Sequence, residues 1–342
     1  MKLDGILPAP SWAQVGATAR RMEELGFDGL LTSEVTQDPF LPLALAAATT
    51  ERLDLGTSIA VAFPRSPMHL AQVGRDLQAN SGGRFILGLG SQVKAHVERR
   101  YSASFDHPAA RMREMVLAIR AIWDSWEHST PLKFEGEFFR HTLMTPFFDP
   151  GPSGHGPARI FVAAVGPLMT EVAGEVADGM FVHGFSTERN LRELTLPALE
   201  RGLRKSGRDR ADVELSYPLF VITGEDEAEL EKADAAVREQ IAFYAATPSY
   251  RPVLELHGWG AIQPQMQALA KDGRWKEMGA RLPTELVDAF AVRGAVDELP
   301  ATISKRYGDI IDRVSLYAPY RPEPERWAGL VAAFKEMSDV KH

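Results

Sequence analysis

Short apolar runs alternate with longer amphipathic segments along the chain of 342 residues. This pattern is typical of repeated βα units, in which a buried parallel strand is followed by a helix. The runs that predict strands are Leu3–Leu7, Gly29–Thr32, Leu53–Val61, Phe85–Leu89, Ile160–Ala163, Met180–Val182, Val213–Ile222 and Val314–Tyr317. The segments that predict helices are Ser11–Leu25, Leu41–Thr50, Met68–Ser81, Ala109–Trp126, Leu168–Ala177, Arg189–Ser206, Glu225–Ala245 and Glu325–Met337. The pattern therefore predicts an α/β fold, a (β/α)8 TIM barrel.

Two longer stretches interrupt the alternation, at about residues 131–156 and 246–282. The first contains a hairpin-like segment, Phe134–Phe139, and the second follows the seventh predicted helix. Stretches of this length without a regular pattern are usually functional loops or lids. We expect one domain over residues 1–342 that carries both stretches as insertions.

Charge and composition exclude several classes of protein. The chain has 38 Lys and Arg against 46 Asp and Glu, a net charge of −8, which argues against a broad surface for nucleic acid or anionic membrane. It has no cysteine, so redox chemistry needs a bound cofactor. The most apolar window, Pro39–Thr50, is shorter than the roughly 20 residues that cross a bilayer. With no secretion signal recognised at the start, we expect a cytoplasmic protein.

Candidate chemistry is sought where strands end, because a barrel of this kind builds its site there. Glu34 follows the second predicted strand and could orient a ligand or handle a proton, or simply form an ion pair. Gly88 and Gly90 resemble part of a dinucleotide fingerprint, but the third glycine is missing and the segment follows a fourth strand. These glycines either let backbone approach a flat ligand or relieve crowding.

Val165-Gly166-Pro167 ends a strand and opens a helix, an arrangement that suits a phosphate but also occurs in plain structural turns. His183-Gly184 comes one βα unit later and could face the same point. The basic residues Lys94, His96, Arg99 and Arg100 indicate a solvated helix face or a site for an anionic cofactor tail. The histidines lack metal-ligand spacing, so we expect no metal.

A set of short motifs runs through nearly the whole chain in a characteristic order. They are Leu25-Gly26-Phe27-Asp28-Gly29 with Ser33-Glu34, Leu55-Gly56-Thr57-Ser58-Ile59, Asn80-Ser81-Gly82-Gly83-Arg84 with Gly88-Leu89-Gly90, Ala163-Ala164-Val165-Gly166-Pro167 and Ala177-Asp178-Gly179. In this order they resemble the luciferase-like monooxygenase superfamily. The combination is most similar to the branch that uses coenzyme F420, an 8-hydroxy-5-deazaflavin, although members that use flavin mononucleotide (FMN) share many of the motifs.

The resemblance implies a cofactor site. A bulge at Thr57-Ser58-Ile59, often with a non-prolyl cis peptide, would press on the central cofactor ring, and Val165-Gly166-Pro167 with His183-Gly184 would hold the phosphate. The implied cofactor-binding residues are Ser58, Ile59, Ala60, Gly90, Ser91, Ala164, Val165, Gly166, Pro167, His183 and Gly184.

The chain departs from the sugar-phosphate dehydrogenases of that branch. Their acid–histidine pair after the second strand reads Glu34-Val35 here, and their catalytic glutamate after the fourth strand falls on Val93. Oxidation of a sugar hydroxyl needs a proton acceptor near the hydride donor, so this activity is not expected.

The resemblance implies an F420-dependent oxidoreductase that transfers a hydride between the reduced cofactor and a small organic substrate. From its position at a strand end, we expect Glu34 to be the catalytic residue that handles the proton. The alternatives are an FMN-dependent monooxygenase that works with a separate reductase, and a non-catalytic deazaflavin-binding protein. We expect a homodimer formed through the apolar segment Pro39–Thr50. We expect residues 246–282 to form a lid in which Tyr250 and Trp259 bind the substrate, or else a peripheral packing segment.

Overall fold

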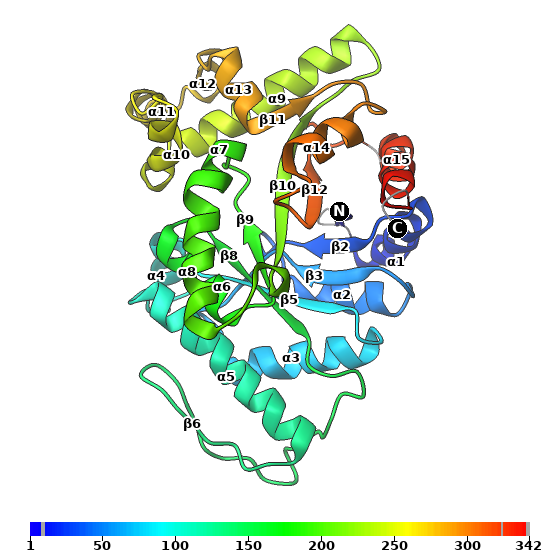
Figure 1. Ribbon diagram of the computed structural model, residues 1–342, viewed down its shortest axis with the longest axis vertical. Helices are drawn as coiled ribbons and strands as arrows, with labels where there is room; N and C mark the ends of the chain where they lie inside the picture. The colour runs from blue at the N-terminus through cyan, green and yellow to red at the C-terminus, as the bar shows by residue number, and fades with distance from the viewer. Residues whose placement is uncertain (8–10, 323, 340–342) are drawn as a thin grey trace. The chain divides into compact units, whose positions relative to one another are not determined.

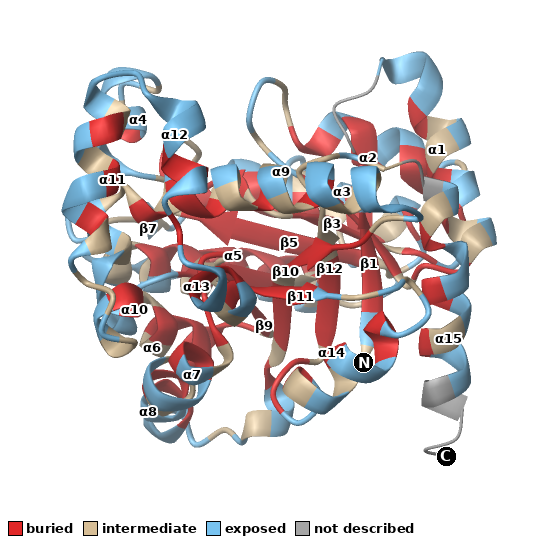
Figure 2. Cartoon of the chain, turned by 90° about the horizontal axis from the view of Figure 1, so that it is seen from above, coloured by how far each residue is buried: buried red, intermediate tan, exposed pale blue. Residues whose placement is uncertain are grey.

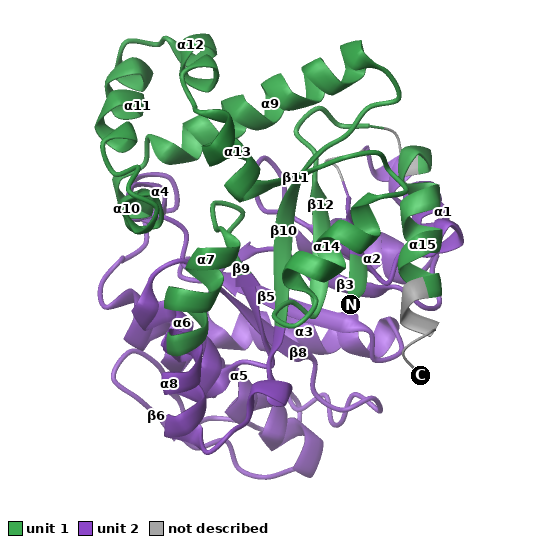
Figure 3. Cartoon of the chain, turned by 45° about the horizontal axis from the view of Figure 1, so that its top comes forward, with its two compact units in different colours: residues 1–3, 182–197, 215–342 green, residues 4–181, 198–214 purple. Residues whose placement is uncertain are grey.

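The structure of the chain is a computed structural model that describes residues 1–7, 11–322 and 324–339. The chain divides into two compact units. Unit 1 comprises residues 1–3, 182–197 and 215–342, and unit 2 comprises residues 4–181 and 198–214 (Figure 3). A single domain over the whole chain stays a prediction.

Unit 2 carries the first strands of the sheet. They are β1 (Lys2–Ile6), β2 (Gly29–Thr32), β3 (Asp54–Thr57), β4 (Ala60–Val61), β5 (Phe85–Gly90), β8 (Arg159–Ala164) and β9 (Gly179–Val182), with a separate hairpin of β6 (Phe134–Glu135) and β7 (Arg140–His141). Every residue of β2 and β5 is buried, and β5 is coloured red in Figure 2. Burial on both faces is typical of parallel strands covered by helices.

The helices of unit 2 include two with well-defined caps, α1 (Trp12–Leu25) and α3 (Pro67–Asn80). The others are α2 (Phe40–Ala47), α4 (Lys94–Arg99), α5 (Pro108–His128), α6 (Pro167–Val176) and the larger part of α8 (Leu196–Ser206). Helix α1 ends at Gly26, whose φ of 96° favours glycine. Helix α3 starts after Ser66, whose side chain accepts a hydrogen bond from the His69 N–H.

Unit 1 holds the last strands and a set of mostly short helices. The strands are β10 (Glu214–Ile222), β11 (Ala291–Arg293) and β12 (Arg313–Tyr317). The helices are α7 (Glu188–Asn190), the π-helical turn Leu191–Thr195, α9 (Glu227–Ala245), α10 (Arg251–Leu256), α11 (Ile262–Lys271), α12 (Trp275–Ala280), α13 (Thr284–Phe290), α14 (Leu299–Tyr307) and α15 (Ala328–Asp339). Buried apolar side chains, among them Phe185, Phe220 and Phe290, form the core of this unit.

The strand order of the sheet identifies the fold. Along the sheet the order is β11-β10-β12-β1-β2-β3-β5-β8-β9, and β10 also pairs with β9 (Figure 1). The pairs β1–β2, β2–β3, β3–β5, β5–β8 and β10–β12 are parallel. This is the order of a (β/α)8 barrel, and the predicted fold class is confirmed.

The third predicted strand, Leu53–Val61, is wrong as one continuous strand. It divides into β3 and β4, with Ser58 and Ile59 between them. The Ser58 N–H donates to the Thr32 carbonyl at 2.6 Å, and the Glu34 N–H donates to the Ile59 carbonyl at 3.2 Å. These bonds turn the backbone out of regular pairing with β5, which a pattern of apolar residues does not reveal.

The two interruptions differ in structure. Residues 131–156 contain the predicted hairpin, β6–β7. Residues 246–282, expected to lack regular structure, contain α10, α11 and α12. These helices have only six to ten residues, too few for a long amphipathic repeat, and they bury Leu254, Met266 and Met278 in the core of unit 1.

Candidate functional site

The segment between β3 and β4 contains one extra residue relative to β5. Gly56 pairs with Ile86 and Ala60 pairs with Leu89. Between these two pairs the chain advances by four residues from Gly56 to Ala60 but by only three residues from Ile86 to Leu89. Such a two-against-one arrangement is a β-bulge. The peptide bond between Ser58 and Ile59 is cis, at the position that the resemblance implies. Ser58 and Ile59 are partly exposed, whereas Ala60 is buried.

Two glycines of β5 make room for this bulge. A Cβ on Gly88 would lie 1.7 Å from the Thr57 carbonyl oxygen, and one on Gly90 would lie 2.7 Å from the Ile59 side chain. The Thr57 hydroxyl donates to the Gly88 carbonyl at 2.7 Å and accepts from the Gly88 N–H at 2.9 Å. Relief of crowding therefore explains both glycines.

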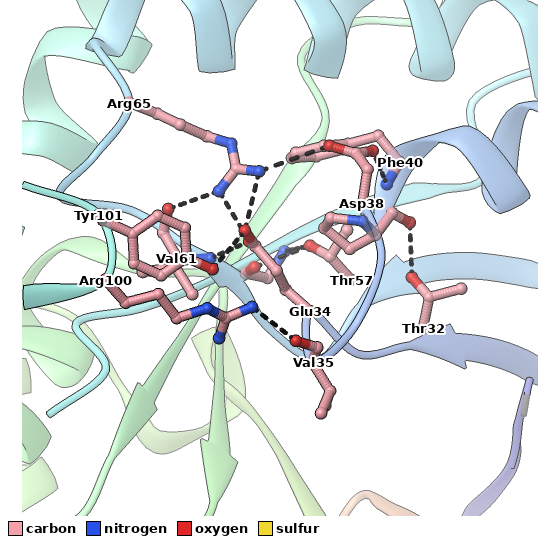
Figure 4. A network of polar contacts seen from close by, with 12 residues as sticks. Thr32, Glu34, Val35, Asp38, Phe40, Thr57, Val61, Arg65, Arg100 and Tyr101 are labelled. Carbon is pink, nitrogen blue, oxygen red and sulfur yellow. Dashed lines mark hydrogen bonds and ion pairs between the residues drawn. The ribbon is translucent and has the colours of Figure 1, made fainter. Parts of the chain in front are cut away.

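Glu34 lies against the bulge with both carboxylate oxygens engaged (Figure 4). Oε2 accepts from the Val61 N–H at 2.7 Å and from Arg65 Nη1 at 2.7 Å. Oε1 accepts from Arg65 Nη2 at 3.1 Å and from the Tyr101 hydroxyl at 2.9 Å. The Glu34 side chain is only 8% exposed. The ion pair that the sequence offered as an alternative role for Glu34 is present, with Arg65 as the partner. The same carboxylate also accepts a hydrogen bond from the backbone of β4 at Val61.

Tyr101 differs from the other donors to Glu34 because a phenol hydroxyl is a stronger acid than a guanidinium or a backbone amide. Burial, followed by the hydrogen bond to Glu34 and its charge, raises the pKa of the Tyr101 hydroxyl. The ring is partly exposed. Tyr101 therefore stays protonated at neutral pH and links the buried Glu34 carboxylate to a more exposed position.

The basic cluster after the fourth predicted strand lies on α4. Lys94 forms an i,i+4 ion pair with Glu98 at 3.7 Å, which is typical of a solvated helix face. Arg100, just beyond the helix, donates to the Val35 carbonyl at 2.7 Å and so fixes the loop after Glu34. Ser91 follows Gly90, and its hydroxyl donates to the Gln92 carbonyl at 3.2 Å.

Gly166 begins α6, directly after β8. A Cβ on Gly166 would meet no atom within 4 Å, so the space above this helix start is open. Val165 and Leu168 are 53% and 70% exposed on either side of it. The first amides of a helix have no partner within the helix and favour an anion. The residues at this point fit the phosphate tail and the apolar edge of a flat cofactor.

In unit 1, His183 follows β9 and contacts Tyr250. The Phe185 N–H donates to His183 Nδ1 at 3.0 Å, and His183 Nε2 lies 3.1 Å from the Tyr250 hydroxyl. Burial lowers the pKa of His183 to about 4, so the ring is neutral at pH 7. A Cβ on the next residue, Gly184, would lie 3.3 Å from the Tyr317 ring.

Trp259 lies away from the strand ends, in the turn between α10 and α11. Its ring stacks on His257 with centroids 4.7 Å apart, and His257 Nε2 lies 2.8 Å from the Thr187 hydroxyl. Trp259 also packs against the core of unit 1. A substrate-binding role for Trp259 stays a prediction.

The structure groups the predicted residues by unit. In unit 2, Glu34 lies beside the segment Ser58–Ala60, and Gly90 contacts Ile59. In unit 1, His183 lies beside Tyr250.

The sequence reasoning missed Arg65, Tyr101, Tyr244 and Tyr317. Tyr317 is the last residue of a predicted strand, so a search of strand ends could have found it. Arg65 and Tyr101 lie 31 and 67 residues from Glu34 and leave no local signal.

Within residues 1–7, 11–322 and 324–339, no three His, Asp or Glu side chains form a group that could hold a metal ion. No helix within them is long and apolar enough to span a membrane.

Comparisons with known proteins agree on one family. The sequence model of the luciferase-like monooxygenases matches residues 2–312. An uncharacterized protein of Mycobacterium tuberculosis is 51% identical over 314 residues, which cover 92% of each chain. An F420-dependent glucose-6-phosphate dehydrogenase of Intrasporangium calvum is 33% identical over 57% of this chain and 60% of its own. The coenzyme F420-dependent tetrahydromethanopterin reductase of Methanopyrus kandleri has the same fold, with a TM-score of 0.79, 22% identity and 96% coverage of each chain.

Proposed function

Because the chain belongs to the luciferase-like monooxygenase family, we propose that it is an oxidoreductase that uses coenzyme F420 to reduce a small organic substrate. The observation that carries this proposal is the sequence similarity to a relative whose name states F420 dependence. Family membership supports the broader statement, an oxidoreductase, independently of the cofactor. A cytoplasmic location stays a prediction.

The local geometry of unit 2 supports the predicted cofactor residues. Ser58 and Ile59 are partly exposed beside β5 and would contact the ring, with Ala60, Gly90 and Ser91 as the neighbouring backbone. Ala164, Val165, Gly166 and Pro167 would hold the phosphate tail at the open start of α6. In unit 1, His183 and Gly184 stay predicted cofactor residues, and His183 would offer a neutral ring rather than a positive charge. When bound in its reduced form, the deazaflavin supplies a hydride.

Proton handling in unit 2 is assigned to Glu34 acting with Tyr101. Glu34 has both oxygens occupied by donors, and of these donors the Tyr101 hydroxyl is the strongest acid. The Tyr101 hydrogen, which Glu34 accepts in this structure, would turn from Glu34 to the substrate and be donated to it, and the charge of Glu34 would then favour reprotonation of Tyr101 from solvent. Arg65 keeps the carboxylate in place from the opposite side.

The substrate is not expected to be a sugar phosphate. Val35 and Val93, which occupy the positions of the histidine and the catalytic glutamate of the dehydrogenases, are apolar and 63% and 47% exposed. Reduction of an electron-poor substrate needs no strong base at these positions.

A binding titration tests the cofactor. Oxidised and reduced F420 and FMN are titrated separately into the purified chain, and fluorescence or absorbance of the cofactor is followed. We expect F420 to bind at least about 10-fold more tightly than FMN, a difference of about 1.4 kcal/mol. Tighter binding of FMN would contradict the proposal and favour a monooxygenase with a separate reductase. Tight F420 binding without turnover of any enone, ketone or imine in a panel would favour a non-catalytic binding protein.

A further inference from the structure

Four polar rings of unit 1 form a contiguous, partly exposed cluster: His183, Tyr244, Tyr250 and Tyr317. The His183 ring lies 4.5 Å from the Tyr250 ring and 4.9 Å from the Tyr244 ring, measured between centroids. The Tyr244 and Tyr317 hydroxyl oxygens are 3.0 Å apart. His183 directly follows β9 and Tyr317 ends β12, so both lie at the carboxyl ends of barrel strands, where sites in this fold are built.

The hydrogen bonds of the first pair of rings, His183 and Tyr250, leave the hydroxyl hydrogen of Tyr250 unused. His183 Nδ1 accepts from the Phe185 N–H, so the neutral ring carries its proton on Nε2. Nε2 therefore donates to the Tyr250 oxygen, 3.1 Å away. The hydrogen of the Tyr250 hydroxyl then has no acceptor in this pair.

The second pair leaves another. The Tyr244 hydroxyl also hydrogen-bonds the Gln240 side chain, and with Tyr244 donating to Tyr317 the bond between the two hydroxyls leaves the Tyr317 hydrogen unused. The cluster thus offers two hydroxyl donors and needs a partner that only accepts hydrogen bonds.

The surroundings of these donors are uncharged. Burial and the neighbouring tyrosine hydroxyls raise the pKa values of Tyr244 and Tyr250, and burial raises that of Tyr317. Among the described residues, no charged side chain contributes to these shifts or to that of His183. The Tyr317 ring stacks on Phe220 with centroids 4.6 Å apart, so the walls are aromatic. An anion bound at the Tyr250 and Tyr317 hydroxyls would lose hydration without gaining a counter-charge, so a phosphate contact of His183 and Gly184 would have to lie outside these hydroxyls.

We infer that the hydroxyl groups of Tyr250 and Tyr317 bind the carbonyl oxygen of an uncharged organic substrate. This inference rests on the proposed function and names its substrate class: an apolar ketone or enone. His183 and Tyr244 act as positioning residues, because each occupies one hydroxyl group of the cluster and leaves a hydrogen directed to the ligand.

A pair of probes with the same ring tests the class. Cyclohex-2-en-1-one is neutral, and cyclohex-1-ene-1-carboxylate carries a charge. Dissociation constants are measured by ligand-observed NMR on the full chain, with and without bound F420. We expect the enone to bind at least 10-fold more tightly than the carboxylate. Tyr250→Phe and Tyr317→Phe should each weaken enone binding about 3- to 10-fold, the effect of one neutral hydrogen bond.

Tyr320→Phe is the matched control, because it removes a hydroxyl from unit 1 outside the cluster, and it should change enone binding less than 2-fold. Equal binding of the two probes, or enone binding unaffected by both cluster variants, would overturn the inference. Because the dissociation constant of the enone is also measured without F420, failure of this inference can be distinguished from failure of the F420 titration. A chain that binds the enone through these hydroxyls but not F420 would refute the proposed function alone.

Discussion

The guanidinium of Arg65 contacts both carboxylate oxygens of Glu34, at 2.7 Å from Oε2 and 3.1 Å from Oε1. The same Nη1 also donates to the Val61 carbonyl at 2.8 Å, and Glu34 accepts from the Val61 N–H. The two members of this ion pair therefore hydrogen-bond the backbone N–H and the backbone carbonyl of Val61 in β4. The carboxylate is fixed between this contact and the Tyr101 hydroxyl.

Removal of the Tyr101 hydroxyl tests the proton-handling proposal. Tyr101→Phe keeps the ring and the Arg65–Glu34 pair but deletes the hydroxyl proton. We expect turnover to fall at least about 100-fold, the lower range for loss of a general acid, with F420 affinity changed less than about 3-fold. Steady-state kinetics and cofactor titration measure the two effects. Glu98→Gln on α4, which removes an exposed carboxylate, is the control; parallel losses of affinity and turnover in Tyr101→Phe would point to a structural role.

A negative charge at the start of α6 should oppose cofactor binding. Gly166→Asp places a carboxylate in the open space beside the first helix amides, where it repels a phosphate. We expect Gly166→Asp to bind F420 at least about 10-fold more weakly than Gly166→Asn, which has the same size without the charge. Fluorescence titration gives both constants. Equal affinities of the two variants would show that the phosphate lies elsewhere.

Gly88 should be intolerant of any side chain. Alanine would place its Cβ 1.7 Å from the Thr57 carbonyl oxygen and 2.6 Å from Phe181. We expect Gly88→Ala to lower the free energy of unfolding by more than about 3 kcal/mol, measured by urea denaturation. Gly90→Ala should cost less, because it meets only the Ile59 side chain, at 2.7 Å. A Gly88→Ala variant as stable as the parent would disprove the close approach of β3 and β5.

His183 should make the stability of the fold depend on pH. Its pKa is lowered to about 4 in the folded chain, below the ordinary value of 6.5, so the unfolded state binds the proton more readily. The stabilisation is present above pH 6.5 and is lost as the pH falls toward 4. Between pH 7 and pH 5 we expect a loss of at most about 2 kcal/mol that His183→Asn, which keeps an acceptor for the Phe185 N–H, does not show. Identical pH profiles of the two chains in urea denaturation would refute this.

Homodimer formation stays a prediction, with α2 as the contact. Leu41 and Leu45 on this helix are 49% and 36% exposed. We expect a dimer in sedimentation at micromolar concentration, and a shift toward monomer in Leu41→Glu, which places a charge on the apolar surface. A parent chain that sediments only as a monomer would contradict the prediction.

The sequence predicted the strands well because buried parallel strands are short apolar runs. Phe85–Leu89 and Ile160–Ala163 each fall within one residue of β5 and β8. Helix α14 and strand β11 were missed, since nine and three residues give too little periodicity. The division of β3 from β4 depends on hydrogen bonds to Thr32 and Glu34, which are distant in sequence.

The candidate site was predictable only in part, for a related reason. The sequence could identify candidate residues that follow predicted strands, because sites in this fold lie at strand ends. These residues are Glu34, Gly166 and His183. The partners that define their chemistry come from other parts of the chain. Tyr101 reaches Glu34 and Tyr250 reaches His183 across 67 residues each, and no local pattern encodes such a pairing.

The extra residue between β3 and β4 also bears on how such a barrel can change over time. The pairing with β5 is regular before the bulge, at Gly56 and Ile86, and regular again after it, at Ala60 and Leu89. At the genetic level the extra residue corresponds to one inserted codon, with both flanking registers kept. Because Gly88 and Gly90 leave the space for this residue, such an insertion fits the sheet only where the facing strand carries glycine at these two positions.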